Sequence, residues 1–274
     1  MIIDFHTHNF PDKIAASVIA KLEAACGTKA STDGTLEGLK RSAKNAGIDI
    51  SVVLPVMTSP KQFETVNRYA AENNGKDGII SFGGIHPDND DPEAKLDQIK
   101  SLGLPGIKIH PDYQGVFIDD ERYIRIIRHA VKIGLYVITH AGFDPAFPEL
   151  VRCTPERALN MLDKVYDGKE PTEPRIILAH LGSLDETDKV IDMIAGKNLY
   201  LDTAVMLDRI PEDKIITLIR KHGADKILFA TDCPWADQKK FVNIINSLDL
   251  TDKERDLITH KNAINILKKQ NIAF

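Results

Sequence analysis

Short apolar runs alternate with longer helical patterns from one end of the chain to the other. We expect eight strands, at residues 2–8, 50–56, 79–86, 106–110, 135–140, 176–180, 199–203 and 227–232. Most are nearly continuous apolar runs, which is typical of a parallel sheet that is packed on both faces. Strict alternation of strand and helix predicts an α/β fold with right-handed crossovers, and eight repeats favour closure into a (β/α)8 TIM barrel.

The segments between the strands carry signals of helix starts and stops. Apolar residues recur at helical spacing in four of them, at 14–22, 123–130, 190–194 and 215–219. Thr154 before Pro155, and Ser59 before Pro60, each place a capping hydroxyl ahead of a first-turn proline. Glycines such as Gly47 follow helical runs and precede strands, as glycines at helix ends often do.

The length of 274 residues is typical of one such barrel. Two stretches look like inserted loops, at 27–34 and 143–174, and the second carries its own helix near 155–166. Neither is long enough for a second domain, so we expect residues 1–274 to form a single barrel domain. An open doubly wound sheet is the alternative. No GxGxxG or Walker loop follows any expected strand, which weakens the nucleotide-binding versions of that alternative.

Charge and composition exclude several classes of partner. The net charge is −5, and 35 basic and 40 acidic residues are mixed along the chain, whereas nucleic-acid binding needs clustered Lys and Arg. No apolar run approaches the ~20 residues of a membrane helix, and the N-terminus lacks a signal-peptide pattern. Three cysteines lie far apart, which suggests a reducing compartment. We therefore expect a cytoplasmic protein that acts on a small molecule and binds neither nucleic acid nor membranes.

Histidines gather at the ends of the expected strands. Six of the nine lie there: His6, His8, His86, His110, His140 and His180. The carboxyl ends of barrel strands form one face, and active sites of this fold are built on that face. His6 and His8 are two positions apart on one strand, so their side chains point the same way and can converge on one metal ion. Chance can also produce such a pair among nine histidines.

His140, His180 and Asp232 strengthen the prediction of a metal site. They lie in the segments ITHAG, LAHLG and ATDCPW, where each follows apolar barrel positions and precedes small or turn residues. A charged Asp that ends an apolar strand needs a partner. Asp232 alone could be a helix cap or half of a salt bridge. Together with His6, His8, His140 and His180, however, it indicates one metal-binding face.

Together with DFHTH at 4–8 and GIKIHP at 106–111, these segments resemble the amidohydrolase superfamily in order and spacing. The resemblance is to its amidohydrolase-related branch of compact metal-dependent TIM-barrel hydrolases, which also contains non-oxidative decarboxylases. It spans nearly the whole chain, and it implies that His6, His8 and His140 are metal ligands. Asp232 would bind the metal, accept a proton from the water on it, or do both. His180 would hydrogen-bond that water.

Lys108 and His110 are ambiguous. In binuclear members of the superfamily, a lysine that ends strand four is carboxylated and bridges two metals, but Lys108 sits deeper than the strand end. Lys108 and His110 lie two residues apart and face the same way, so they could instead bind an anionic group of the substrate. A third alternative pairs Lys108 with a buried carboxylate such as Asp4.

Four further residues are candidates for contact with the substrate. His86 can form a wall of the pocket or be an ordinary loop histidine. Trp235 can cover the pocket or pack in the core. Tyr113 and Gln114 follow the fourth strand closely enough to reach a substrate.

The leading hypothesis is a hydrolase that uses a metal-activated water on a C–N or C–O bond of a small substrate, which can carry a carboxylate. Three His and one Asp suit one Zn2+, with Mn2+ or another divalent ion as the alternative. A non-oxidative decarboxylase on the same scaffold is the first rival, and a non-catalytic metal-binding protein is the second. A homodimer is a further expectation, because such barrels commonly pair.

Overall fold

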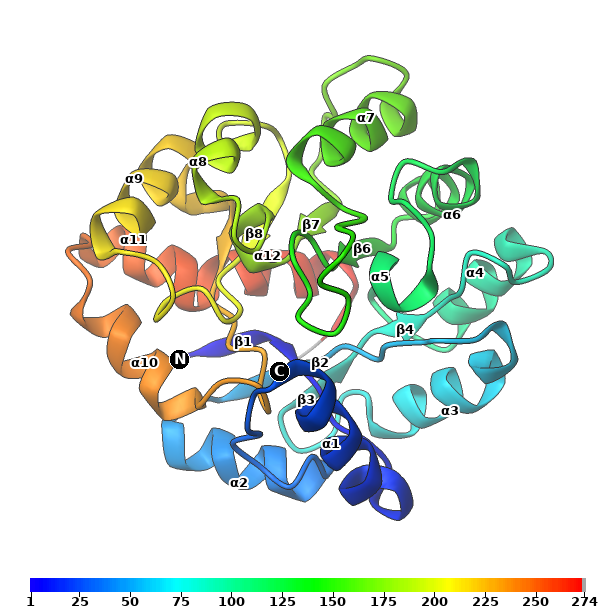
Figure 1. The fold of residues 1–274 in the computed structure, drawn as a ribbon, viewed down its shortest axis with the longest axis horizontal. Coiled ribbons are helices and arrows are strands. Elements are labelled where there is room, and N and C mark those ends of the chain that lie inside the picture. Colours follow the sequence, from blue (N-terminus) through cyan, green and yellow to red (C-terminus); the bar gives the residue numbers. More distant parts are fainter. Residues whose placement is uncertain (273–274) are drawn as a thin grey trace.

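Parallel strands ring the centre and helices surround them in the computed structural model of this protein, which describes residues 1–272 (Figure 1). Neighbouring strands in the ring are neighbours in sequence, and every strand pair is parallel. The strands are β1 (Ile3–Thr7), β2 (Ile50–Val53), β3 (Ile79–Ser81), β4 (Gly83–Gly84), β5 (Gly106–Ile109), β6 (Tyr136–Thr139), β7 (Ile176–Leu178), β8 (Tyr200–Asp202) and β9 (Ile227–Leu228).

Backbone hydrogen bonds close the ring. β3 and β4 form one barrel strand that is interrupted at Phe82, whose N–H still donates to Val53 O at 3.0 Å, a normal hydrogen-bond distance. The first and last strands join where Phe5 N–H donates to Phe229 O (2.9 Å) and Asp232 N–H donates to His6 O (2.8 Å). The predicted (β/α)8 TIM barrel is therefore confirmed.

The strands end earlier in the sequence than we predicted. The strand predicted at 50–56 ends at Val53, and the one at 227–232 ends at Leu228. The reason is visible at His180 (φ 60°) and Asp232 (φ 73°), whose left-handed backbone turns the chain away from the ladder. Such conformations cost free energy in non-glycine residues and often occur at functional sites. The candidate site residues thus occupy turns just beyond the regular strands.

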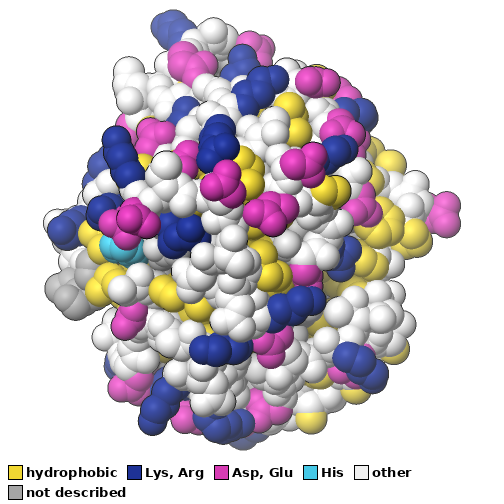
Figure 2. Space-filling model, turned by 90° about the vertical axis from the view of Figure 1, so that its left-hand side faces the viewer, with side chains coloured by type: hydrophobic (Ala, Val, Ile, Leu, Met, Phe, Trp, Pro, Cys, Tyr) yellow, Lys and Arg dark blue, Asp and Glu magenta, His cyan; other side chains and the backbone are white. Residues whose placement is uncertain are grey.

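Most helices pack around the outside of the barrel, whereas α12 (Asn262–Lys269) lies behind its centre (Figure 1), where Ala263, Ile266 and Leu267 contact the apolar residues of the barrel interior. The other helices are α1 (Asp12–Cys26), α2 (Leu36–Ala46), α3 (Phe63–Asn73), α4 (Pro92–Ser101), α5 (Pro111–Gln114), α6 (Glu121–Lys132), α7 (Pro155–Tyr166), α8 (Thr187–Lys189), α9 (Glu212–His222), α10 (Gln238–Ser247) and α11 (Asp252–Asp256). No helix within residues 1–272 combines the length and the apolar character needed to cross a membrane. Figure 2 shows acidic and basic side chains interspersed over one face of the molecule.

The predicted helix signals hold at most positions. Thr154 caps α7 by accepting a hydrogen bond from Arg157 N–H, and α7 covers the predicted residues 155–166. Ser59 caps a short 3-10 turn that leads into α3. The segment predicted as helical at 190–194 is a π-helical turn that continues α8, which is wider than the α-helix expected from its spacing.

The period of two along the strands separates two apolar layers. On β6, Tyr136 and Ile138 pack inside the barrel, whereas Val137 packs outward against the helices. On β5, Ile107 and Ile109 belong to the outer layer, so Lys108 between them points inward. Lys108 is 1% exposed, so the strand places an amine inside the barrel.

Candidate metal centre

Three of the predicted ligands meet at the joint between the first and last strands. His6 lies on β1, His8 follows it, and Asp232 follows β9. One donor atom of each lies within 4.8 Å of the others. Asp232 Oδ1 is 3.3 Å from His6 Nε2 and 3.0 Å from His8 Nε2. The backbone hydrogen bond between Asp232 and His6 holds the two turns together.

Partners on the far side of each ring determine which nitrogen is free. His8 Nδ1 lies 2.7 Å from the carbonyl oxygen of Leu54, which can only accept, so Nδ1 carries the proton. In the neutral ring, Nε2 then presents a lone pair to the Asp232 carboxylate. Two acceptors this close need a proton or a metal ion between them. The donor set therefore fits a divalent metal ion, with the Leu54 carbonyl fixing the ligand tautomer.

His6 is held in a similar way by a carboxylate. Its Nδ1 lies 2.8 Å from Asp202 Oδ2, and both side chains are buried. Asp202 Oδ1 accepts hydrogen bonds from the backbone N–H groups of His180 (2.9 Å) and Ala204 (3.1 Å), which fixes the carboxylate. This arrangement directs His6 Nε2 toward Asp232. Sequence reasoning missed Asp202, although it ends an apolar strand as a polar residue, the signal that drew attention to the histidines.

The protonation states suit metal binding, which requires neutral imidazole and ionised carboxylate. Burial, together with the charge of nearby Lys108, lowers the pKa of His6 well below its ordinary value. Burial alone would raise the pKa of Asp232, but the neighbouring His6 and His8 outweigh it and hold that pKa below its usual range. At neutral pH, His6 is therefore neutral and Asp232 carries its charge.

Lys108 lies at the edge of this group. Its Nζ is 3.1 Å from His6 Nε2. Asp4, the carboxylate suggested as a partner of Lys108, instead accepts hydrogen bonds from Thr231 Oγ1 (2.6 Å) and Gln238 Nε2 (2.8 Å). Burial lowers the pKa of Lys108 to about 8, with Asp202 and Asp232 acting in the opposite direction. At neutral pH the amine is mostly charged.

His140 and His180 form a hydrogen-bonded pair beside the group of His6, His8 and Asp232. His180 Nδ1 lies 3.1 Å from the carbonyl oxygen of Ala204, so it must donate, and His180 Nε2 is an acceptor. His140 Nδ1 lies 2.9 Å from that Nε2. The His180 ring centroid is 5.4 Å from that of His6 and 4.7 Å from that of His140. His180 thus lies next to both rings, and His140 is not among the three residues whose donor atoms already converge.

A second group of polar side chains lies where His110 meets the inserted loop at 143–174. Its Nε2 is 3.4 Å from Asp144 Oδ2, and its ring stacks on His140 with centroids 4.2 Å apart. Tyr113 presents its ring edge-on to His110, and Phe147 of the same inserted loop packs against Tyr113. The inserted loop therefore reaches the histidines.

The remaining candidates have structural contacts. His86 Nδ1 accepts a hydrogen bond from Asp88 N–H of its own loop. Trp235 is half-buried and packs against the outer apolar layer, as the packing alternative expects. Gln114 accepts hydrogen bonds from Tyr123 Oη (2.5 Å) and His110 N–H (3.1 Å), so its amide braces the turn after β5.

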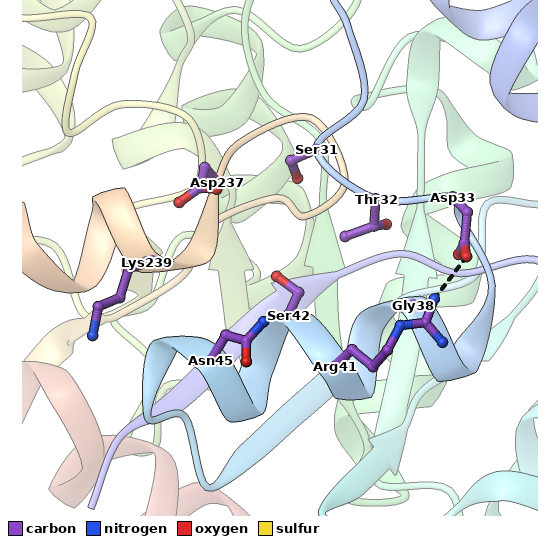
Figure 3. A pocket seen from close by; sticks show the side chains of 9 residues that line it. All are labelled: Ser31, Thr32, Asp33, Gly38, Arg41, Ser42, Asn45, Asp237 and Lys239. Carbon is purple, nitrogen blue, oxygen red and sulfur yellow. Dashed lines mark hydrogen bonds and ion pairs between the residues drawn. The ribbon is translucent and has the colours of Figure 1, made fainter.

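A separate surface pocket of about 280 Å³ lies beside the first inserted loop, between α2 and α10 (Figure 3). It is lined by Ser31, Thr32, Asp33, Gly38, Arg41, Ser42, Asn45, Asp237 and Lys239. Arg41 Nη2 pairs with Asp33 Oδ2 at 2.9 Å along its wall. None of the predicted site residues lines this pocket, and we assign it no function.

Comparison with known proteins gives both a family and a fold. The Amidohydrolase family model matches residues 3–269. No curated protein matches the chain. Among solved structures, an uncharacterised TIM-barrel protein from Bordetella bronchiseptica is similar at 19% identity, covering 98% of this chain and 99% of that one, with a TM-score of 0.78.

Two decarboxylases are also similar in structure. A 2,6-dihydroxybenzoate decarboxylase complexed with 2,6-dihydroxybenzoate has 16% identity and a TM-score of 0.74, covering 97% of this chain and 99% of that one. A dihydroxybenzoic acid decarboxylase from Polaromonas with bound manganese has 16% identity and a TM-score of 0.69, covering 97% and 96%. At these identities the likeness shows the fold. The family, the manganese in such relatives and the His/Asp groups together support a divalent metal here. Because the family match extends over nearly the whole barrel, this protein belongs to the amidohydrolase family.

Proposed function

We propose that this protein is a metal-dependent hydrolase that cleaves a C–N or C–O bond of a small, carboxylated substrate with water. The observation that carries the proposal is the character of the polar groups around the converging ligands. Asp232 is ionised, and His180 Nε2 is an acceptor because Ala204 O holds the proton on Nδ1. Hydrolysis needs such bases to take a proton from water.

Each residue of the proposed site has a separate role. His6, His8, His140 and Asp232 would hold the ion, and Zn2+ suits three nitrogens and one oxygen, with Mn2+ as the alternative. When bound, the ion lowers the pKa of a water and polarises the bond under attack. Asp232 takes one proton from the attacking water and returns it to the leaving nitrogen or oxygen. His180 Nε2 accepts a hydrogen bond from that water and orients it.

Lys108 and His110 would bind the carboxylate of the substrate. The Lys108 ammonium is buried beside His6, so an anion placed there would gain a charge-assisted hydrogen bond in a region of low dielectric. The inserted loop at 143–174 would select the rest of the substrate, since Asp144 and Phe147 bring it against His110 and Tyr113.

Non-oxidative decarboxylation is the second candidate, and two observations favour it. Several similar structures are decarboxylases of hydroxylated benzoates. Lys108, with a pKa of about 8, is also a proton donor that could replace the departing carboxylate by hydrogen. The two reactions share the same ion and ligands and differ in which group handles the proton.

One experiment separates the candidates. Zn2+- and Mn2+-loaded protein is incubated with lactones, amides and carboxylated aromatics in 18O-labelled water, with the His6→Ala variant as control. Hydrolysis places one 18O in the product. Release of CO2 without incorporation of 18O into the product would replace the hydrolase by the decarboxylase. No turnover above the control across the panel would favour the non-catalytic alternative.

A further inference from the structure

The hydrogen-bonded pair of His140 and His180 leaves an unusual contact on its outer side. Since His180 Nε2 can only accept, His140 Nδ1 must carry the proton between them, and His140 Nε2 then presents a lone pair. That nitrogen lies 3.8 Å from Asp112 Oδ2. Within the described residues both atoms are buried and neither has a hydrogen-bond partner. Two buried acceptors facing each other are unfavourable, so this arrangement calls for an explanation.

Asp112 is held in place by its other oxygen. Asp112 Oδ1 accepts a hydrogen bond from Arg152 N–H at 3.2 Å and lies 3.5 Å from Arg152 Nη1. The Asp112 side chain is fully buried, with 0% exposure. The carboxylate is therefore fixed, with Oδ2 directed at the His140 ring. The contact between Asp202 and His6 shows the same pairing of a buried carboxylate with a site histidine, there at 2.8 Å.

We propose that Asp112 is a positioning residue that holds His140 in its metal-binding tautomer, with the ring proton on Nε2 donated to Asp112 Oδ2 and Nδ1 free for the ion. The inference rests on the proposed function, in which His140 is a ligand. The ring stays neutral, because the proton lost from Nδ1 is matched by one gained at Nε2. Nε2 and Oδ2 are 3.8 Å apart, so a small approach of the ring to Asp112 completes this hydrogen bond and satisfies both orphaned atoms. The change also frees His180 Nε2 to accept a hydrogen bond from the reacting water.

A second metal ion between His110, His140 and Asp144 is the competing explanation, since their donor atoms also lie within 4.8 Å of one another. The rings of His110 and His140 argue against it. Their planes are 9° from parallel and their centroids are 4.2 Å apart. An imidazole lone pair lies in the plane of its own ring, so one ion cannot lie in both planes. The stacked rings fit a single ligand histidine with a supporting neighbour.

The test is the Asp112→Asn variant. Its amide oxygen can still accept from Arg152, and its NH2 group then faces His140 Nε2 and donates to it. This stabilises the tautomer with the proton on Nδ1, which cannot bind the ion. Affinity for Zn2+ and Mn2+, measured by competition with a chromogenic chelator, should fall about 10–100-fold. The metal-free variant should melt at the wild-type temperature or above it, because the two facing acceptors are gone. A merely structural role for Asp112 would instead lower that melting temperature.

Two matched variants make the outcome interpretable. Asp144→Asn changes a neighbouring buried carboxylate that contacts His110, and it should leave metal affinity and stoichiometry unchanged. Loss of an ion in Asp144→Asn would establish the second metal site and overturn the proposal. His6→Ala tests the metal site itself. If His6→Ala loses the ion while Asp112→Asn binds it as tightly as the wild type, the role of Asp112 is wrong and the metal site stands.

A spectroscopic measurement needs no variant. Nitrogen-15 NMR of labelled histidine rings distinguishes the two neutral tautomers. Addition of Zn2+ to the metal-free protein should move the His140 proton from Nδ1 to Nε2. A His140 signal that keeps its proton on Nδ1 in the loaded protein would also overturn the proposal.

Discussion

His222 and His140 are both buried histidines, but they lie at opposite ends of the barrel and have different partners. His222, at the end of α9, accepts a hydrogen bond from Gly196 N–H (3.2 Å) and donates one to Leu199 O (2.9 Å), beside the amino end of β8. Both its nitrogens are satisfied by backbone. His140, just after β6, has one nitrogen without a partner among residues 1–272. Burial lowers the pKa of each, so burial does not distinguish them. The unpartnered nitrogen, and not burial, is what distinguishes the proposed ligand His140 from His222.

The strongest test of this comparison is removal of both His6 and His8. We expect the wild type to hold close to one divalent ion per chain. His6→Ala combined with His8→Ala should abolish that content, because both Nε2 donors are lost. Inductively coupled plasma mass spectrometry of protein purified without chelator measures it. The His222→Gln variant is the control and should retain the ion. Full metal retention in the double variant would remove the proposed centre.

His180 should separate metal binding from turnover. Its Nε2 serves as an acceptor beside the ligands, so His180→Ala should keep the ion and lower kcat by about 10²–10⁴-fold. Metal content and kcat are measured on one preparation. A parallel fall of both quantities would make His180 a ligand and would break the distinction between His180 and the ligand histidines.

Lys108 should affect substrate binding and leave metal binding unchanged. Loss of a charge-assisted contact worth about 1.5–3 kcal/mol should raise KM for an anionic substrate by roughly 10–100-fold in Lys108→Met, with the ion content unchanged. Since the pKa of Lys108 is lowered to about 8, the amine loses its charge above that pH. The wild-type KM should therefore climb toward that of the variant between pH 7 and 9. A KM that is flat over this range, or loss of the ion in Lys108→Met, would contradict the assignment.

His222 should affect stability and leave the site intact. Burial lowers its pKa from 6.5 to about 4, so the folded state binds the proton less readily than the unfolded state does. Its contribution to stability is present above pH 6.5 and is lost as the pH falls toward 4, on the order of 3 kcal/mol in total. Urea unfolding from pH 7 to pH 4 should show this loss in the wild type and a flatter profile in His222→Gln. An equally steep profile in the variant would assign the acid sensitivity to other groups.

The sequence was sufficient to predict the barrel and the gathering of its histidines. Periodicity located every strand, and barrel topology brings strand ends to one face whatever the loops do. It could not show which ring nitrogen is free. That depends on carbonyl groups such as Leu54 O and Ala204 O, which reach the rings from neighbouring strands. A backbone oxygen has no signature in the sequence.

The two supporting carboxylates illustrate the same limit. Asp202 ends a strand in the manner of the histidines, and the pattern that selected them could have selected it as well. Asp112 lies in the first turn of the short helix α5, where an aspartate is unremarkable. Only its fixed orientation by Arg152 and its distance from His140 distinguish it.

The proposed metal centre joins distant parts of the sequence: His8 and Asp232 are 224 positions apart, yet they lie side by side where β1 meets β9. During synthesis the histidine pair emerges first, and its carboxylate partner emerges only after most of the barrel has been translated. If the proposed ligand set holds, a prematurely terminated chain never completes it. Acquisition of the ion would then follow the joining of β1 to β9, and metal content would mark finished molecules.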